Sequence, residues 1–276
     1  MKVISVNKVR DLVARLSIEA NTILRPDVLA ALTKAYRQEK NKKVKSALAA
    51  ILDNAAIAKK EKLAICQDTG LPCVFVELGQ NVKIAGDLMD VINKGVESGY
   101  KKGYFRNSVI KDPLARGKSG FGPAIIHIDL VKGNKLKISV LPKGFGCENK
   151  SRLKMFNPTA SLDEIKEFIV DVVKNSKADA CPPYVVGVGI GGTAEYAGIL
   201  AKKALFRKVA SHNLGAAKKL ENNLLREINK LNIGVMGLGG LTCLGVNIET
   251  APTHIAGLPV AVNISCHALR SATGEI

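Results

Sequence analysis

The first 62 residues place apolar side chains at helical spacing. From Val9 to Leu16 they recur every three or four positions, which predicts an amphipathic helix that Ser5 could cap. Pro26, a residue type favoured in the first turn of a helix, begins a second apolar stripe. A third stripe runs from Lys43 to Lys60 and has lysines at both ends. The pattern therefore predicts a helical N-terminal part, about residues 1–62.

Beyond Gly70 the apolar residues gather in shorter runs. Runs rich in valine, isoleucine and leucine predict strands at 73–78, 124–130, 135–141, 184–188, 233–236, 244–248 and 260–264. Helical spacing returns at 86–101 and 193–208, and Ser161 with Glu164 forms a capping box that opens a further helix. The runs at 124–130 and 135–141 flank a Lys-Gly-Asn turn, so we predict that they pair. Strands mixed with helices indicate a mixed α/β (α+β) fold, with layered β-sheets and packed helices in one domain over residues 1–276.

The chain is strongly basic, which favours partners or substrates that carry negative charge. Lysine and arginine number 41 against 24 aspartates and glutamates, a formal net charge of +17. A nucleic-acid binder, an enzyme for anionic substrates and a subunit with an acidic partner all fit this charge. Aromatic residues make up only 4% of the chain and tryptophan is absent, which disfavours binding by base stacking. We interpret the lysine clusters as solvated helix faces.

The sequence predicts neither a membrane span nor a secretion signal. Apolar runs of about 18 residues without charges or frequent glycine do not occur. The N-terminus lacks the long apolar core of a signal peptide. Six dispersed cysteines in 276 residues do not form a disulfide scaffold. We therefore expect a cytoplasmic protein whose thiols stay reduced or bind metal.

Four segments combine turn residues with side chains suited to chemistry: 65–72, 142–152, 180–193 and 250–270. The first holds a cysteine, an amide and a carboxylate in one turn. The second has spaced glycines followed by donors suited to carboxylate or phosphate. The fourth contains His254, His267 and Arg270, which could bind an anion or a metal. From spacing alone, each segment could also be a loop with a purely structural role.

The third segment contains a G-x-G-x-x-G pattern, from Gly187 to Gly192, between a predicted strand and a predicted helix. A dinucleotide site of this type needs an acidic residue about 20 positions later for the ribose. Residues 202–220 contain no aspartate or glutamate, so NAD binding is disfavoured. A helix N-terminus preceded by glycines still suits an anion.

Taken together and in this order, the segments resemble the α subunit of the iron–sulfur, class I fumarate hydratases and L-tartrate dehydratases. The resemblance rests on Cys66-Gln67-Asp68-Thr69-Gly70, the stretch from Gly146 to Met155, Cys181-Pro182-Pro183 with the glycines up to Thr193, and His254 with Cys266-His267. It covers residues 5 to 276. It implies a hydro-lyase that hydrates fumarate reversibly to L-malate, with dehydration of L-tartrate to oxaloacetate as the alternative.

The resemblance also implies a [4Fe–4S] cluster, held by Cys66, Cys181 and Cys266. Three thiolates leave one iron with an open coordination site, which can act as a Lewis acid on a substrate hydroxyl. Asp68, close to a ligand, is the implied general acid or base. The implied contacts to the dicarboxylate are Gln67, Arg106, Gly146, Asn149, Lys150 and His254.

The sequence departs from the family in one loop. Relatives commonly read Gly-Gly-Gly-Ser-Glu-Asn, whereas Phe145 and Cys147 here replace a glycine and the serine. We interpret Cys147 as a non-ligand. In the fused enzymes, a second region supplies a threonine base and further arginine and lysine contacts, and this chain ends before it. We therefore expect a heteromer with a separate β subunit.

Two further functions remain as alternatives. A basic nucleic-acid-binding protein would show steeply salt-dependent binding. A cluster-based sensor would keep the cysteines without chemistry, but it has no need of dicarboxylate contacts such as Gln67 and Arg106. Neither nucleic acid nor a membrane is an expected partner. The motifs do not separate fumarate from tartrate, because both are four-carbon dicarboxylates.

Overall fold

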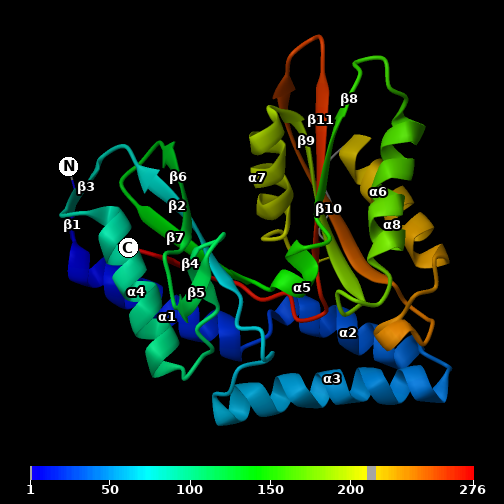
Figure 1. Ribbon diagram of the computed structural model, residues 1–276, viewed down its shortest axis with the longest axis horizontal. Helices are drawn as coiled ribbons and strands as arrows, with labels where there is room; N and C mark the ends of the chain where they lie inside the picture. Colours follow the sequence, from blue (N-terminus) through cyan, green and yellow to red (C-terminus); the bar gives the residue numbers. More distant parts are fainter. Residues whose placement is uncertain (1, 210–215) are drawn as a thin grey trace. The chain divides into compact units, whose positions relative to one another are not determined.

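The computed structural model describes residues 2–209 and 216–276 and has the predicted mixed α+β fold (Figure 1). The chain divides into two compact units. Unit 1 comprises Met1–Arg25, Asn54–Phe145 and Arg270–Ile276, and unit 2 comprises Pro26–Asp53 and Gly146–Leu269. Among the described residues, no helix is long and apolar enough to cross a membrane.

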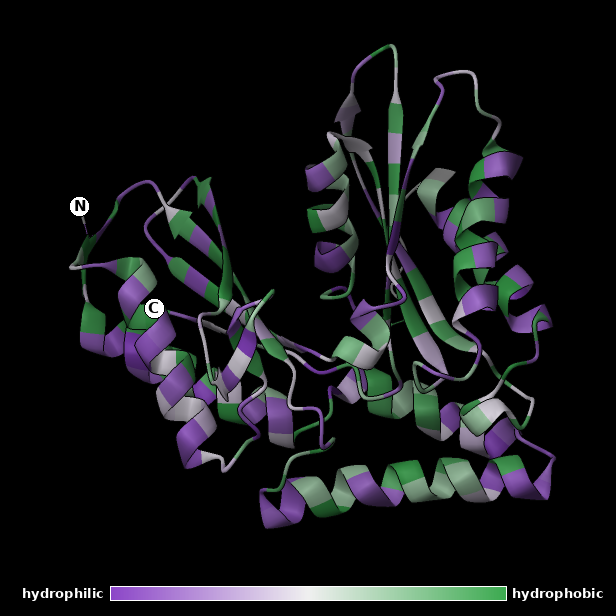
Figure 2. Cartoon of the chain, in the orientation of Figure 1, coloured by the Kyte–Doolittle hydropathy of each residue, from purple (hydrophilic) through white to green (hydrophobic). Residues whose placement is uncertain are grey.

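The three predicted N-terminal helices are confirmed as α1 (Val6–Thr22), α2 (Pro26–Gln38) and α3 (Lys42–Glu61). Ser5 is the N-cap residue of α1, although its side chain makes no cap hydrogen bond. Figure 2 shows helices on which hydrophobic and hydrophilic segments alternate, as expected of amphipathic helices. Because α1 belongs to unit 1 and α2 to unit 2, the helical N-terminal part is shared between the units.

The main sheet of unit 1 is built around β2 (Leu71–Gly79). β2 pairs antiparallel with β7 (Leu136–Lys143) and parallel with β6 (Ile125–Val131). β12 (Ala272–Glu275) extends the sheet beyond β7. The strands predicted at 124–130 and 135–141 therefore exist, but the prediction that they pair is wrong, because β2 lies between them.

The connection from β6 to β7 folds over the end of β2 and does not form a hairpin. Gly79 N–H donates to the carbonyl of Lys135 at 2.9 Å, and Asn81 N–H donates to that of Gly133 at 3.0 Å. A Cβ on Gly79 would lie 2.7 Å from the Gly133 carbonyl oxygen, so the turn requires glycine there. This arrangement gives the buried strand β2 a hydrogen-bonded neighbour on each side.

Helices α1 and α4 (Leu88–Lys102) pack against the face of this sheet that carries Val74 and Val76. Asp87 caps α4 by accepting hydrogen bonds from two backbone N–H groups of its first turn. The two helices approach closely, since a Cβ on Gly99 would lie only 2.6 Å from a backbone oxygen of α1. Two short pairs complete unit 1: β1 (Lys2–Ser5) with β3 (Val82–Ala85), and β4 (Val109–Asp112) with β5 (Arg116–Gly120).

The sheet of unit 2 has the order β10-β9-β11-β8. Its strands are β8 (Arg152–Phe156), β9 (Tyr184–Gly192), β10 (Cys243–Thr253) and β11 (Leu258–Ser265). β9 and β10 are parallel, whereas β11 is antiparallel to both of its neighbours. Three of the predicted strands are thereby confirmed.

The strand predicted at 233–236 is wrong. Residues Val235–Gly237 form a 3₁₀ turn, η1. Gly234, Met236 and Gly237 have φ angles of 63°, 54° and 75°, which no β-strand accommodates. The two glycines make this left-handed course possible, so they outweigh the apolar residues between them.

Helices flank the sheet of unit 2. The predicted capping box of α6 (Leu162–Ser176) is confirmed, because the Ser161 hydroxyl accepts from Glu164 N–H at 3.2 Å and the Glu164 carboxylate accepts from Ser161 N–H at 2.7 Å. α7 (Ala194–Ala204) is shorter than predicted. α8 (Ala216–Lys230) was not predicted, and a single short turn forms α5 (Phe145–Glu148).

The glycines of the G-x-G-x-x-G sequence allow α7 to lie directly on β9. A Cβ on Gly187 would lie 2.1 Å from the Ala201 carbonyl oxygen, and one on Gly189 would lie 2.0 Å from that of Ala197. Gly192 has a φ of +71° where the chain turns from β9 into α7. Close packing therefore accounts for these glycines without a bound nucleotide.

We expect Gly189→Ala to destabilise unit 2 by about 3 kcal/mol, because the new methyl group would overlap backbone atoms that cannot move aside. The free energy of unfolding in urea would measure the loss. Gly198→Ala on α7, the helix that packs against Gly189, is the control, since a Cβ at position 198 meets no atom within 4 Å. The control should be neutral or stabilising by about 0.5–1 kcal/mol. Equal stability of the two variants would contradict the packing argument.

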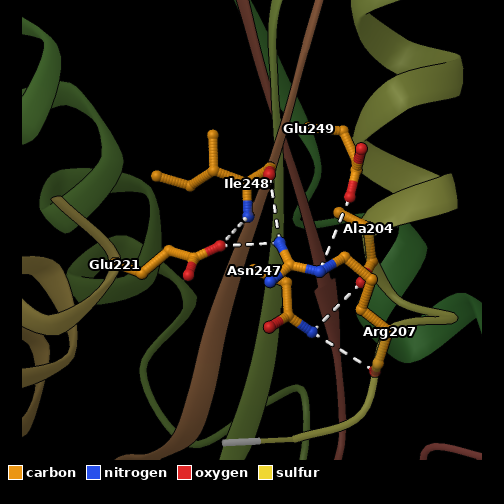
Figure 3. A network of polar contacts seen from close by, with 6 residues as sticks. All are labelled: Ala204, Arg207, Glu221, Asn247, Ile248 and Glu249. Atoms are coloured by element: carbon orange, nitrogen blue, oxygen red, sulfur yellow. Dashed lines mark hydrogen bonds and ion pairs between the residues drawn. The ribbon is translucent and has the colours of Figure 1, made fainter. Parts of the chain in front are cut away.

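A polar network joins the end of α7 to β10 and α8 (Figure 3). The Arg207 guanidinium lies 2.7 Å from the Glu221 carboxylate and donates to the Ile248 carbonyl at 3.1 Å. The same Glu221 oxygen accepts from Ile248 N–H at 2.8 Å. The Asn247 amide donates to the carbonyls of Ala204 at 3.1 Å and of Arg207 at 3.3 Å. Charged and polar groups thus bind three elements together inside unit 2.

Candidate active site

In unit 1, the turn from Cys66 to Gly70 holds a carboxylate in a fixed position. One oxygen of Asp68 accepts from Gly70 N–H at 2.9 Å, and the other accepts from Phe145 N–H at 2.8 Å. Gly70 has a φ of +75°, and a Cβ there would lie 2.7 Å from the carbonyl carbon of Pro142. Asp68 remains partly exposed. The turn therefore presents a carboxylate that two backbone donors orient.

Three groups hold the backbone of this turn. The Tyr100 hydroxyl donates to the Thr69 carbonyl at 2.8 Å, and the Thr69 hydroxyl donates to the Arg106 carbonyl at 3.0 Å. The Arg270 guanidinium donates to the carbonyl of Asp68. Burial raises the pKa of Tyr100 well above its usual value, so its hydroxyl remains a neutral donor. These contacts place Arg106 beside the turn.

Unit 1 therefore brings together four of the predicted site residues: Cys66, Gln67, Asp68 and Arg106. The Cys66 thiol is partly exposed and donates to the Gln67 amide oxygen at 3.4 Å. The side chains of Gln67 and Arg106 are exposed. The turn thus carries an acid, an amide and a thiol, and the backbone of Arg106 lies beside it.

Unit 2 brings two further predicted cysteines together. Cys181 precedes β9 and Cys266 follows β11. Because β9 and β11 are antiparallel neighbours, the start of β9 and the end of β11 lie at the same end of the sheet. The backbone N–H of His267 donates to the Cys181 carbonyl at 3.2 Å, and its ring Nδ1 lies 3.1 Å from the same oxygen. Cys181 is exposed and Cys266 partly exposed.

Gly146, Asn149 and Lys150 lie in and after α5. Gly146 and Asn149 are exposed. The Lys150 ammonium lies 2.9 Å from the carboxylate of Asp179, which precedes Cys181 by two residues. The hydrogen bond from Lys150 lowers the pKa of the Asp179 carboxyl. Lys150 therefore lies near the Cys181 segment, in contact with a carboxylate of its own chain.

Within unit 2, His254 lies away from Cys266. It lies between β10 and β11, at the end of the sheet opposite to Cys266. An extended strand rises about 3.3 Å per residue, so β11 separates the two by about 25 Å. The His254 ring is exposed, and its Nδ1 accepts from Ala256 N–H at 3.1 Å. The glycines that end β9 lie at this same far end.

The six cysteines fall into two groups by burial. Cys66, Cys181 and Cys266, the predicted ligands, are exposed or partly exposed, whereas Cys73, Cys147 and Cys243 are buried. Burial raises the pKa of the Cys243 thiol to about 12, which opposes the thiolate form that a metal needs. The Cys147 thiol donates to the carbonyl of Ala180 at 3.3 Å. The exposed thiols therefore fit a metal group better than the buried ones.

Within residues 2–209 and 216–276, no three His, Cys, Asp or Glu side chains form a group that could hold a single metal ion. The proposed ligands come from both units: Cys66 belongs to unit 1, and Cys181 and Cys266 belong to unit 2.

The sequence does not predict Tyr100 and Arg270 as partners of the Asp68 turn. Tyr100 lies in the helix predicted at 86–101, and Arg270 is predicted to bind an anion or a metal. Arg270 is only 3% exposed, and its guanidinium binds a backbone carbonyl of the Asp68 turn. No local sequence signal marks either residue as a partner of a turn so far away along the chain.

Known proteins resemble this chain over nearly its whole length. A sequence profile described as fumarate hydratase (Fumerase) matches residues 10–275. A relative from Methanocaldococcus jannaschii, provisionally named an L(+)-tartrate dehydratase subunit alpha, is 40% identical over 280 residues, covering 98% of each chain. The L(+)-tartrate dehydratase subunit alpha of Escherichia coli K12 is 31% identical over 275 residues, covering 98% of this chain and 91% of the relative. The protein of that name from Shigella sonnei gives the same values.

By these matches the chain is a hydro-lyase. Such an enzyme removes water from its substrate to form a carbon–carbon double bond, or adds water across one. The chain belongs to the fumarate hydratase (Fumerase) family, whose profile spans nearly its whole length. The resemblance found in the sequence is thereby confirmed.

Proposed function

We propose that this chain is the α subunit of a heteromeric iron–sulfur hydro-lyase that acts on a four-carbon dicarboxylate. The observation that carries the proposal is the turn in which Asp68 is fixed by two backbone donors beside Cys66 and Arg106. A carboxylate in that position can exchange a proton with a substrate carbon or oxygen. The family match supports the same class of reaction.

We propose Cys66, Cys181 and Cys266 as the ligands of a [4Fe–4S] cluster, because these are the accessible thiols of the chain. When bound, such a cluster supplies a Lewis acid at the iron that has no protein ligand. The remaining chemistry belongs to the side chains of the protein. Cys73, Cys147 and Cys243 stay outside the proposed site because they are buried.

The side chains divide the reaction between them. Asp68 acts as a general acid or base toward the substrate, and its two backbone donors keep its free lone pairs oriented. Arg106 offers a planar fork for a carboxylate, and Gln67 and Asn149 offer amide donors. Lys150 would exchange the exposed carboxylate of Asp179 for one of the substrate. His254 is left out, because it lies at the far end of its sheet.

The relatives change the order of the two substrates. The resemblance in the sequence puts fumarate first, but the named relatives are L(+)-tartrate dehydratase α subunits. We therefore place L(+)-tartrate first, with loss of water giving oxaloacetate. Fumarate is the second candidate, because the matching profile carries the name of fumarate hydratase. The alpha-subunit names also support a separate β subunit, which we propose completes the site.

The test is anaerobic assay of the reconstituted α and β subunits with L-tartrate, fumarate and L-malate in parallel. We expect kcat/KM for L-tartrate to exceed that for fumarate at least tenfold, and the α chain alone to be inactive. A preference for fumarate would reverse the order of substrates. Full activity of the α chain alone would overturn the heteromer, and inactivity toward all three compounds would overturn the proposed function.

The ligand set makes a separate prediction about iron content. After anaerobic reconstitution with iron and sulfide, Cys66→Ser, Cys181→Ser and Cys266→Ser should each lose most of the bound iron and visible absorbance. Cys73→Ser and Cys243→Ser are the controls, since these thiols are fully buried in the sheets. The controls should bind iron as the wild type does. Iron loss in a control that remains folded would contradict the ligand set.

A further inference from the structure

Strand β6 is the outer edge of the main sheet in unit 1, and it carries exposed apolar side chains. The sheet order β12-β7-β2-β6 leaves β6 with β2 as its sheet neighbour. Leu130 is 73% exposed, and Ile125 and Ile128 are each 44% exposed. Exposed hydrophobic edges of this kind are suited to pairing with another strand.

Proteins usually protect such edges with charged residues or proline. The edge strand β8 of unit 2 follows this rule, because it contains Arg152 and Lys154. β6, with the sequence Ile-Ile-His-Ile-Asp-Leu-Val, contains no lysine, arginine or proline. Its only charged or titratable side chains are those of His127 and Asp129. β6 therefore lacks the features that keep a second strand away.

The pairing with β2 shows which backbone groups of β6 point outward. Gln80 N–H donates to the Val131 carbonyl at 2.8 Å, and Val131 is opposite Gly79 in the parallel ladder. In a parallel pair, alternate residues direct both backbone groups to the neighbour. The backbone N–H and C=O groups of His127, Asp129 and Val131 therefore point toward β2. Those of Ile126, Ile128 and Leu130 point toward the outer edge of the sheet.

The polar side chains of β6 favour one register for antiparallel pairing with an identical strand. Outward-facing residues must pair with each other, so the two-fold axis can pass through His127, Ile128 or Asp129. An axis at Asp129 would set two aspartates face to face, and one at His127 would set two histidines face to face. An axis at Ile128 sets His127 of each copy opposite Asp129 of the other. In this register a ring N–H of His127 can donate to the carboxylate of Asp129, whereas two carboxylates set opposite each other repel.

We propose that β6 pairs antiparallel with β6 of a second copy of this chain, with the two-fold axis at Ile128, so that the two sheets become continuous. His127 and Asp129 then form two symmetric pairs at the non-hydrogen-bonded positions, where opposing side chains lie closest. Phe75 stacks on His127 with ring centroids 4.8 Å apart and holds the ring on that face.

The other face of the joined strands is apolar. Ile128 meets its own copy at the axis, and Ile126 lies opposite Leu130 of the second copy. In the single chain, Ile126 already packs against the hydrophobic core that α1 and α4 cover. Pairing therefore extends this core across the axis and shields Leu130, the most exposed apolar residue of the strand.

The test is the dissociation constant of the dimer, measured on the full chain by analytical ultracentrifugation. His127→Asp sets two carboxylates opposite each other, and Asp129→Lys removes the carboxylate that accepts from the His127 ring, so each should weaken the dimer about tenfold or more. The double variant His127→Asp with Asp129→Lys sets a carboxylate opposite an ammonium group and should recover most of the affinity. Met155→Glu on β8, a 55% exposed position, is the control and should leave the dimer unchanged.

Each outcome decides the proposal. A chain that remains monomeric at about 100 μM overturns it, as does a dimer that the single variants leave intact. Weakening by the single variants without recovery in the double variant points to a different partner or register and also overturns it. Circular dichroism and urea unfolding of the variants show that they remain folded. The experiment needs neither cluster nor substrate, so it stands or falls independently of the proposed function.

Discussion

An Asp68→Asn enzyme is expected to lose turnover by about 10²–10⁴-fold while it keeps its bound iron. An amide cannot take up the proton that a carboxylate takes up. It also fits the turn poorly, because both oxygens of Asp68 accept from backbone N–H groups. An asparagine would turn its NH₂ group toward one of these donors, at a cost of about 1–3 kcal/mol. Turnover, iron content and unfolding would be measured on the same preparation.

Asp112→Asn is the matched control for this change. A single oxygen of Asp112 accepts from both Leu114 N–H and Ala115 N–H, so the amide oxygen of asparagine can replace it. The same backbone bonds lower the pKa of the Asp112 carboxyl, which is fully exposed. The control should keep both activity and stability at neutral pH. Unchanged turnover in Asp68→Asn would remove Asp68 from the mechanism.

The second large effect concerns the network of Arg207 and Glu221. Glu221 is 2% exposed and lies 2.7 Å from the Arg207 guanidinium, whose Nε is 3.6 Å from Glu249 (Figure 3). Removal of one partner from a buried ion pair leaves an uncompensated charge and costs about 3–5 kcal/mol. Glu221→Ala also removes the acceptor of Ile248 N–H. We expect a loss of this size in the free energy of unfolding.

Glu227→Ala on the same helix tests whether burial is the cause. Glu227 forms a salt bridge with Lys230 at 2.8 Å, but its side chain is exposed to solvent. Exposed pairs contribute about 0–1 kcal/mol. The control should therefore unfold close to the wild type. If the two glutamate variants lost equal stability, the argument from burial would be wrong.

Local patterns in the sequence predicted the elements whose signals are local. The capping box of Ser161 and Glu164 and the proline at the start of α2 follow from neighbouring residues. The insertion of β2 between β6 and β7 is different, because it depends on pairs such as Cys73 with Leu141. A turn sequence between two apolar runs cannot report a third strand from elsewhere in the chain. α8 was not predicted, although Leu220, Leu224 and Ile228 recur at helical spacing and pack in the core.

The site shows the same division. The turn at Asp68 could be predicted because its residues are adjacent, but Tyr100 and Arg270 contact it from 31 and 202 positions away. His254 and Cys266 are close in sequence, and the motif order suggested one site. An intervening strand of eight residues places them at opposite ends of a sheet. Short sequence distance therefore indicated proximity only where no regular element intervened.

The position of β12 has a consequence for synthesis of the chain. β12 completes the sheet of unit 1 beside β7, but the ribosome makes it roughly 130 residues after β7, which takes on the order of 10 s at about 5–20 residues per second. All four strands of the unit 2 sheet are made before β12. Until β12 is made, the edge of β7 that pairs with β12 has no neighbouring strand. During that interval the nascent chain exposes an unpaired strand edge to chaperones and to aggregation.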